Sequence, residues 1–283
     1  IRAPAIAELT RAANEGRSGT AELVLHGAAK HVLARAKPLA SGRGTVLVLR
    51  DVTDAHKLDA VRRDFVANAS HELRTPISVI RANAETLLDG AMEDPVHGPP
   101  MLEALLRNAD RMARVVSDLL DISRIESGGW ELSPSEVDAR AAAAAVTERL
   151  GPMARSRNVT LEVKIAPHVR IRADAKAFDL VLSNLVENAA KYCDDGGRVE
   201  IDAIEGEHGR VTLEVRDDGP GIEPRHRDRI FERFYRVDPG RSRAVGGTGL
   251  GLSIVKNLVE LMGGKVGMRP RSPRGSTFWV EIG

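Results

Sequence analysis

The chain has 283 residues, and its 41 Lys and Arg against 40 Asp and Glu give a formal net charge of +1. That length suggests about two domains of ~150 residues each. The near-neutral charge argues against direct nucleic-acid binding, which needs a basic surface, and 3% aromatic residues argue against a base-stacking platform. The longest apolar runs fall far short of the ~20 residues of a membrane span, and a single cysteine, Cys193, excludes an internal disulfide. We therefore predict a soluble chain in which Cys193 is a small packed residue.

Three short strands are predicted in the first part of the chain. The β-prone runs are residues 22–25, 31–36 and 45–49, and turn-forming residues at 26–27 and 41–44 separate them. Three strands in about 50 residues are fewer than a complete domain usually holds. The segment is therefore expected to be the end of a truncated domain.

A helical hairpin is predicted next. From residue 55 the apolar residues follow alternating 3/4 spacing in two stripes until about Gly90, and a second helix with the same spacing runs from about Leu102 to residues 127–129. Pro95 and residues 98–100 are assigned to the turn. Two stripes on one long helix indicate more than one packing neighbour, as in a four-helix bundle. Because a single hairpin buries too little apolar surface, we predict a homodimer.

The last part reads as helices packed on a sheet. Ser135 and Asp138 have the spacing of a capping box, which predicts a helix to about Leu150. Period-2 alternation predicts strands at 161–165, 199–201, 211–215 and 278–282, and helices are expected at 178–192 and 252–262. This order favours an α+β two-layer sandwich with a mixed sheet.

A histidine with three chemically useful neighbours lies on the first long helix. His71 is followed by Glu72, whose carboxylate can orient an imidazole and take its proton when it acts as a nucleophile. Thr75 follows one turn later on the same face, where its hydroxyl can orient a water molecule. Pro76 removes the hydrogen bond to the carbonyl of Glu72 and predicts a kink. A lone helical histidine is more often a solvated or packed residue, so these neighbours carry the prediction.

Residues 65–80, FVANASHELRTPISVI, closely resemble the H-box of sensor histidine kinases of the HisKA type. Residues 182–192, 217–222, 231–235 and 246–252 resemble the N, G1, F and G2 boxes of that family, in the family's order. The resemblance implies a dimeric four-helix bundle made from the hairpin, and an ATP-binding domain of the Bergerat or GHKL fold. It divides the chain into a partial PAS-like segment (1–54), a dimerisation and phosphotransfer hairpin (55–129) and a catalytic domain (130–283).

The resemblance also implies roles for individual residues. Asn188 is expected to bind Mg²⁺, Lys191 to contact phosphate and Tyr192 to lie beside adenine, while Asp217 can accept a hydrogen bond from the adenine amine. Glycines let the backbone approach the nucleotide, and the helix from about Leu252 offers N-terminal amides to phosphate. The full set expected to bind ATP and Mg²⁺ is Asn184, Asn188, Lys191, Tyr192, Asp217, Gly219, Gly221, Gly247, Thr248, Gly249, Leu250 and Gly251.

The glycine run is neither a Walker A motif, because no Lys-Ser/Thr follows it, nor a Rossmann fingerprint, because its spacing differs. Residues 238–243 have the composition of a lid whose arginines either meet the γ-phosphate or are simply solvated. The strands that end at residues 51–53 resemble the end of a PAS domain, and the order of segments is similar to the phosphate-regulon type of sensor kinase.

The resemblance predicts a protein-histidine kinase, an ATP:protein-L-histidine phosphotransferase. His71 takes the γ-phosphoryl group, Glu72 accepts the proton, and the phosphoryl group passes to an aspartate of a response regulator receiver domain. Glu72 and Thr75 match the E-x-x-T pattern for dephosphorylation of the regulator. Two alternatives remain open, a related GHKL ATPase and a non-catalytic dimeric scaffold. No direct nucleic-acid partner is expected. The chain is expected to be the cytoplasmic portion of a protein anchored in the bacterial inner membrane through a segment absent from it.

Overall fold

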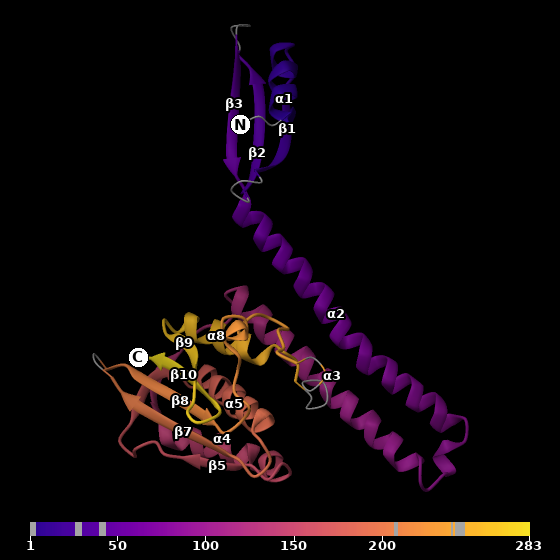
Figure 1. Cartoon of the computed structure of the whole chain (residues 1–283), viewed down its shortest axis with the longest axis vertical. Helices are drawn as coiled ribbons and strands as arrows, with labels where there is room; N and C mark the ends of the chain where they lie inside the picture. Colours follow the sequence, from indigo (N-terminus) through magenta and orange to yellow (C-terminus); the bar gives the residue numbers. More distant parts are fainter. Residues whose placement is uncertain (1–3, 26–29, 40–43, 207–208, 239, 241–246) are drawn as a thin grey trace. The chain divides into compact units, whose positions relative to one another are not determined.

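The computed structural model describes residues 4–25, 30–39, 44–206, 209–238, 240 and 247–283. It divides into two compact units, Ile1–Asn68 and Ala69–Gly283. The boundary lies inside helix α2, Thr53–Leu88, which is drawn in Figure 1. The turn predicted at 26–27 and most of the turn at 41–44 lie outside the described residues.

The first unit contains one helix and a three-stranded antiparallel sheet. Helix α1 is Pro4–Asn14, and strands β1, Gly19–Leu25, β2, Lys30–Pro38, and β3, Thr45–Asp51, lie in the order β1-β2-β3. The three predicted strands are confirmed, each somewhat longer than expected. Helix α1 was not predicted. The resemblance of this segment to a PAS domain stays a prediction.

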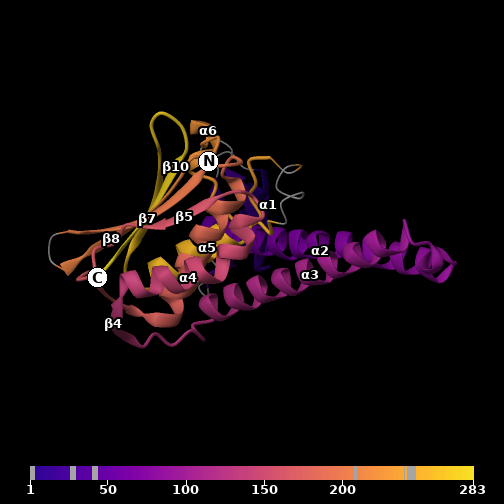
Figure 2. The same ribbon diagram turned by 90° about the horizontal axis from the view of Figure 1, so that it is seen from below.

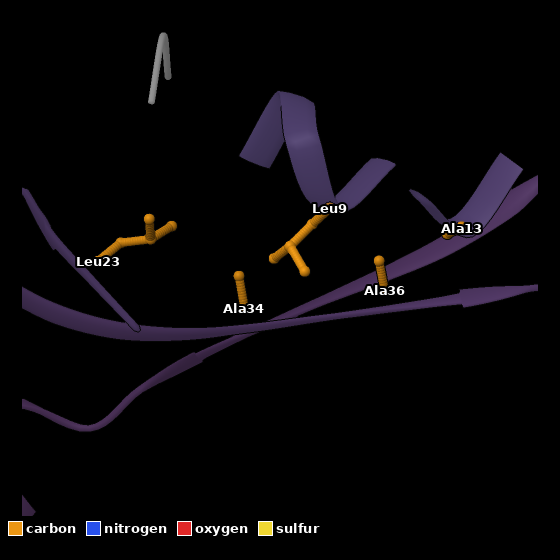
Figure 3. Packing of buried hydrophobic residues seen from close by; sticks show 5 residues of the cluster. All are labelled: Leu9, Ala13, Leu23, Ala34 and Ala36. Carbon is orange, nitrogen blue, oxygen red and sulfur yellow. The ribbon is translucent and has the colours of Figure 1, made fainter. Parts of the chain in front are cut away.

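A small apolar core joins α1 to the sheet, as Figure 3 shows. Leu9 and Ala13 come from α1, Leu23 from β1, and Ala34 and Ala36 from β2. Ala34 and Ala36 are two residues apart and therefore face the same side of the sheet. Their small side chains let the helix approach the strand closely.

The hairpin consists of α2, the 3₁₀ turn η1, Ala91–Glu93, and α3, Gly98–Glu126. Both predicted helices are confirmed. Residues 98–100, which were expected in the turn, instead form the first turn of α3, because a proline there sacrifices no intrahelical hydrogen bond. Pro76 is buried inside α2, and the helix continues through it.

The last part of the chain forms a five-stranded mixed sheet in the order β5-β7-β8-β10-β9, with β5 parallel to β7 and the other pairs antiparallel. Figure 2 shows α4 and α5 beside this sheet. A second, two-stranded sheet pairs β4 with β6. The elements are β4, Pro134–Asp138; α4, Ala139–Arg155; β5, Thr160–Val163; β6, Arg170–Asp174; α5, Ala175–Tyr192; β7, Arg198–Glu205; β8, Val211–Asp217; α6, Pro224–Arg227; α8, Gly251–Leu261; β9, Lys265–Pro270; and β10, Ser276–Ile282.

The predicted α+β sandwich is confirmed, but one detail of its start is wrong. Ser135 lies in strand β4 and does not cap a helix. Asp138 is itself the N-cap of α4, and its Oδ1 accepts a hydrogen bond from the Ala141 N–H at 2.9 Å. The capping-box spacing was fortuitous, because antiparallel pairing of β4 with β6 extends the chain up to Asp138.

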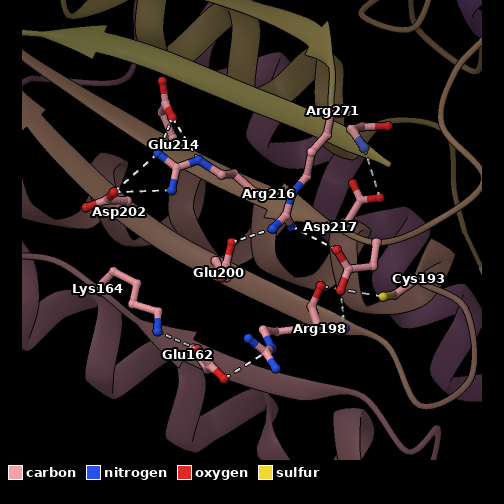
Figure 4. Close-up of polar contacts among 12 residues, drawn as sticks. Glu162, Lys164, Cys193, Arg198, Glu200, Asp202, Glu214, Arg216, Asp217 and Arg271 are labelled. Carbon is pink, nitrogen blue, oxygen red and sulfur yellow. Dashed lines mark hydrogen bonds and ion pairs between the residues drawn. The ribbon is translucent and has the colours of Figure 1, made fainter. Parts of the chain in front are cut away.

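Alternation along β8 gives the sheet two chemically different faces. Val211, Leu213 and Val215 are buried, and Asp217 ends the strand on the same face. On the opposite face Arg216 bonds both Glu214 and Asp202, within the charged network drawn in Figure 4. The inward alternation therefore aims Asp217 toward the helices.

Candidate active site

A cavity of about 560 Å³ lies between helix α5, helix α3 and the loops that follow β8 and precede α8. All but two of the residues that the sequence predicts for ATP binding line it. These residues are Asn184, Asn188, Lys191, Tyr192, Asp217, Gly221, Gly247, Thr248, Gly249 and Gly251. Gly219 and Leu250 are the two that do not. Segments separated by more than 60 residues in the sequence thus converge on one site.

Helix α5 contributes one polar wall. Asn184, Asn188 and Lys191 recur at intervals of four and three residues, which places them on one helical face toward the cavity. The side-chain amide of Asn184 donates to the Leu180 carbonyl at 2.8 Å, and Lys191 Nζ lies 2.7 Å from a Glu187 carboxylate oxygen. These local bonds hold the polar groups in place before any ligand arrives.

Asp217 is the most deeply buried carboxylate in the cavity wall, with 4% of its surface exposed. Its Oδ1 accepts hydrogen bonds from the backbone N–H groups of Gly219, at 2.9 Å, and Ser276, at 3.3 Å. Burial raises the pKa of Asp217 to about 6. The site therefore presents an acceptor with a fixed orientation.

Two positions near the cavity need glycine, because another backbone segment passes too close for a Cβ atom. A Cβ on Gly219 would lie 2.7 Å from the Tyr192 carbonyl oxygen, so only glycine lets the turn after β8 pass the end of α5. Gly249 has φ of +76°, and a Cβ there would lie 3.0 Å from the Cα of Phe234. Gly219 thus shapes the cavity without lining it.

The entry into α8 shows how Leu250, which is expected to bind the nucleotide, is placed. Its side chain is fully buried in the core, while its backbone N–H donates to the Thr248 hydroxyl at 3.2 Å. A Cβ on the next residue, Gly251, would lie 2.5 Å from Asn184 Oδ1. The glycine loop is therefore fitted directly against α5. The predicted lid lies outside the described residues except for Asp238 and Gly240, and so does Gly246.

Helix α3 supplies a second polar wall that the sequence analysis missed. Arg114, Ser117, Asp118 and Asp121 line the cavity. Asp118 Oδ2 accepts a hydrogen bond from the Thr248 hydroxyl at 2.7 Å, and burial raises the pKa of Asp118 to about 6. Their i, i+3, i+4, i+7 spacing was a visible signal, but such a stripe is more often a solvated helix face.

The residues expected to carry the phosphotransfer chemistry lie on α2, outside the cavity lining. His71 and Thr75 are exposed, and the Thr75 hydroxyl donates to the His71 carbonyl at 3.4 Å. Glu72 is partly buried, and its Oε2 accepts hydrogen bonds from Arg111 and Arg236, each at 2.9 Å.

Arg236 connects the two sets of predicted residues. It follows directly after the F-box motif and lines the cavity. Its Nη2 donates to the Gly247 carbonyl at 2.8 Å as well as to Glu72. One guanidinium group therefore touches both the glycine loop and the residue beside His71, a contact that links positions 164 residues apart in the sequence.

Fold and site together define an ATP-binding domain joined to a helical hairpin that carries His71. The family model of the His Kinase A (phospho-acceptor) domain matches residues 61–128, and the model of the histidine kinase-, DNA gyrase B- and HSP90-like ATPase matches residues 173–283. The chain belongs to the sensor histidine kinases. Sensor protein SrrB of Staphylococcus aureus is 33% identical over 239 residues, which cover 84% of this chain and 41% of that protein. The chain thus spans less than half the length of this relative.

Solved structures agree with the fold. Full-length ShkA in complex with AMPPNP is 30% identical, with a TM-score of 0.58 over 77% of this chain and 45% of that chain. Histidine kinase AdeS of Acinetobacter baumannii has a TM-score of 0.62 at 24% identity, over 75% of this chain and 96% of that chain, and it supports the fold alone. Among the described residues, every helix is too short or too polar to cross a bilayer.

Proposed function

We propose that this protein is a sensor histidine kinase that transfers the γ-phosphoryl group of ATP to His71 and from there to an aspartate of a response regulator. The observation that carries the proposal is the position of Arg236. It lines the predicted nucleotide cavity and bonds Glu72, the neighbour of His71. The nucleotide site and the acceptor helix are thereby within reach of one side chain. We also propose the division into segments 1–54, 55–129 and 130–283.

The transfer is a nucleophilic substitution at phosphorus. The Nε2 lone pair of His71 forms the P–N bond while the bond from the γ-phosphorus to the β,γ-bridging oxygen breaks, and ADP leaves with that electron pair. Glu72 accepts the Nδ1 proton, so that the phosphorylated imidazole ends neutral. The contribution of the protein is positioning and charge neutralisation.

Different residues of the cavity would contact different parts of the nucleotide. Asp217 accepts a hydrogen bond from the adenine amine, and Lys191 and the amides at the start of α8 face the phosphates. Asn188 would hold Mg²⁺, because a side-chain amide oxygen in the cavity wall is a hard ligand of the kind this ion takes. The bound ion would neutralise charge on the β- and γ-phosphates.

A homodimer is proposed from the unpartnered apolar surface of the hairpin. On α3, Leu102 and Leu106 are exposed four residues apart, as are Val116 and Leu120 further along, and Leu106 is 67% exposed. Such a stripe is unfavourable in water and matches the seam of a four-helix bundle. A second hairpin would cover it.

The receiver domain of a response regulator is the proposed partner, and dephosphorylation of that regulator is a proposed second activity. Both rest on the resemblance of the segment around His71 to the family's H-box, with Thr75 orienting the attacking water. The Thr75 hydroxyl is exposed on the same helix as His71. The cytoplasmic location of this portion stays a prediction.

The central experiment uses two variants with complementary defects. Labelling with γ-³²P-ATP and Mg²⁺ is expected for the wild type and absent for His71→Ala and for Asn188→Ala. His71→Ala should still bind an ATP analogue, whereas Asn188→Ala should lose the Mg²⁺-dependent part of the affinity for that analogue. The label should be acid-labile, as a phosphoramidate is.

Mixing the two variants tests the dimer and the direction of transfer. If the subunits exchange and transfer occurs between them, the mixture regains label on the Asn188→Ala chain, whereas transfer within one subunit leaves the mixture unlabelled. Sedimentation of each variant establishes the dimer independently. Labelled His71→Ala, or label that survives mild acid, contradicts the proposed acceptor. ATP hydrolysis without label indicates the GHKL ATPase, and no ATP binding indicates the scaffold.

A further inference from the structure

Glu72 is held by an arginine of the opposite hairpin helix. Arg111 on α3 donates from Nη2 to Glu72 Oε2 at 2.9 Å, and the two side chains are only 13% and 21% exposed. This is one of the few ion pairs of the hairpin that is shielded from water; the pair one turn earlier, Arg107 with Glu103, is 65% and 70% exposed. Shielding strengthens the interaction and restricts the Glu72 carboxylate to one orientation.

The two arginines that bond Glu72 differ in what else they face. Arg236 lines the cavity and also bonds the Gly247 carbonyl, so a polyphosphate that enters the cavity competes with Glu72 for its guanidinium group. Arg111 does not line the cavity. When Arg236 turns to an anion, Arg111 is the partner that still holds Glu72.

Arg111 contacts Glu72 through Nη2 and not through Nε. Its Nε is buried and has no hydrogen-bond partner in the described part of the chain. A buried unpaired N–H is unfavourable for folding, and such groups are rare in native structures. The Nε of Arg236 is likewise unpaired, so the Nη2 contact with Glu72 is the polar contact that matters for the position of each side chain.

We propose that Arg111 is a positioning residue for phosphotransfer, which keeps the Glu72 carboxylate in place to take the proton from His71 while Arg236 engages the nucleotide. The inference rests on the proposed function. Both arginines bond Oε2, so Oε1 is the oxygen that receives the proton. Without Arg111 the Glu72 side chain regains rotamer freedom once Arg236 leaves it.

The test compares Arg111→Met with Arg111→Lys, and uses Arg107→Met as the matched control on the same helix. Arg111→Met should lower kcat for autophosphorylation by about tenfold or more. This loss should stay smaller than the ~10²–10⁴-fold that a general base typically supplies, and KM for ATP should change by less than about twofold. Arg111→Lys should recover part of kcat. Arg107→Met should behave like the wild type. Equal kcat for Arg111→Met and the wild type overturns the proposal.

A double-mutant cycle separates positioning from a merely structural contact. If Arg111 acts through Glu72, then Arg111→Met added to Glu72→Gln lowers kcat no further, whereas additive losses show that it acts in another way and overturn the proposal. Urea unfolding of the wild type, the two single variants and the double variant measures the coupling energy of the two residues independently of catalysis. Absence of label in the wild type refutes the proposed function, and absence of coupling in unfolding refutes the Arg111 contact itself.

Discussion

In the ATP-binding domain Asp217 is 4% exposed and accepts hydrogen bonds from two backbone N–H groups. On the hairpin, by contrast, His71 is exposed to solvent. The residues predicted to bind the nucleotide are oriented by hydrogen bonds within their own domain. Under the proposed function His71 must stay accessible, because it would meet first a nucleotide and then a partner protein. Exposure of His71 is thus a requirement of the proposed reaction.

The apolar side chains show the same contrast. Phe178, Leu185 and Phe278 are buried in the interior of the ATP-binding domain, while Leu106 and Leu120 project from the hairpin into solvent. One region completes its core with a single chain, and the other leaves an apolar stripe exposed, which the proposed homodimer would cover. The predictions below test how far the nucleotide site depends on this rigid packing.

The largest effect is expected for Gly219→Ala. The added Cβ would lie 2.7 Å from the Tyr192 carbonyl oxygen, so the turn after β8 must move away from α5 and carry Asp217 with it. Overpacking of this kind costs ~1–3 kcal/mol, which corresponds to as much as ~100-fold weaker binding of an ATP analogue. Fluorescence titration measures it.

Gly206→Ala is the control, because its nearest neighbour, the Arg210 carbonyl oxygen, would lie at 3.4 Å. It should bind the analogue as the wild type does. If Gly219→Ala also binds the analogue normally, the packing of the turn after β8 against α5 does not determine the shape of the nucleotide site.

Asp217→Asn should stabilise the free protein at neutral pH. Burial raises the pKa of Asp217 to about 6 from 3.8, so the fold favours the neutral carboxyl. Its stabilising contribution is complete below about pH 4 and is lost as pH rises through about 6. Asparagine remains neutral, so the variant should gain about 3 kcal/mol in free energy of unfolding at pH 7.5 and little at pH 4.

Urea unfolding at both pH values checks this, with Asp110→Asn, at an exposed site on α3, as the control. A gain at pH 7.5 that persists at pH 4 would show that something other than buried charge is responsible.

Asp118→Asn should have the smallest effect, and it acts where the two regions meet. Burial raises the pKa of Asp118 to about 6, so the group is ionised at neutral pH beside the predicted phosphate site. Asparagine can still accept the hydrogen bond from Thr248 but does not repel phosphate. ATP should bind about three- to fivefold more tightly to the variant at pH 7.5 and equally to both proteins at pH 5.

Calorimetry measures the affinity of both proteins for ATP in the same buffers. The protonation of ATP itself affects both proteins equally and cancels in the comparison. Weaker binding by Asp118→Asn at pH 7.5 would instead assign this carboxylate a supporting role in the site.

Most of the fold and most of the cavity lining were predictable, because local pattern encodes them. Helical periodicity predicted α2 and α3, alternation predicted β8 and β10, and the motif residues needed only their short-range spacing. The misses have a common cause. Helix α1 and strands β4, β6 and β9 are short elements whose formation depends on pairing or packing with distant segments. The capping box at Ser135 failed for the same reason.

The amino-acid sequence by itself determined the class of fold, the order of the segments and the chemistry available at His71, Glu72 and Asp217. Those properties follow from residue type and spacing along the chain. Only the tertiary structure decided that Asp118 and Arg236 line the cavity and that Arg111 bonds Glu72, since the partners of these three residues lie 130, 164 and 39 residues away in the sequence. Burial, which raises the pKa of Asp118, arises only when the helices and loops have come together.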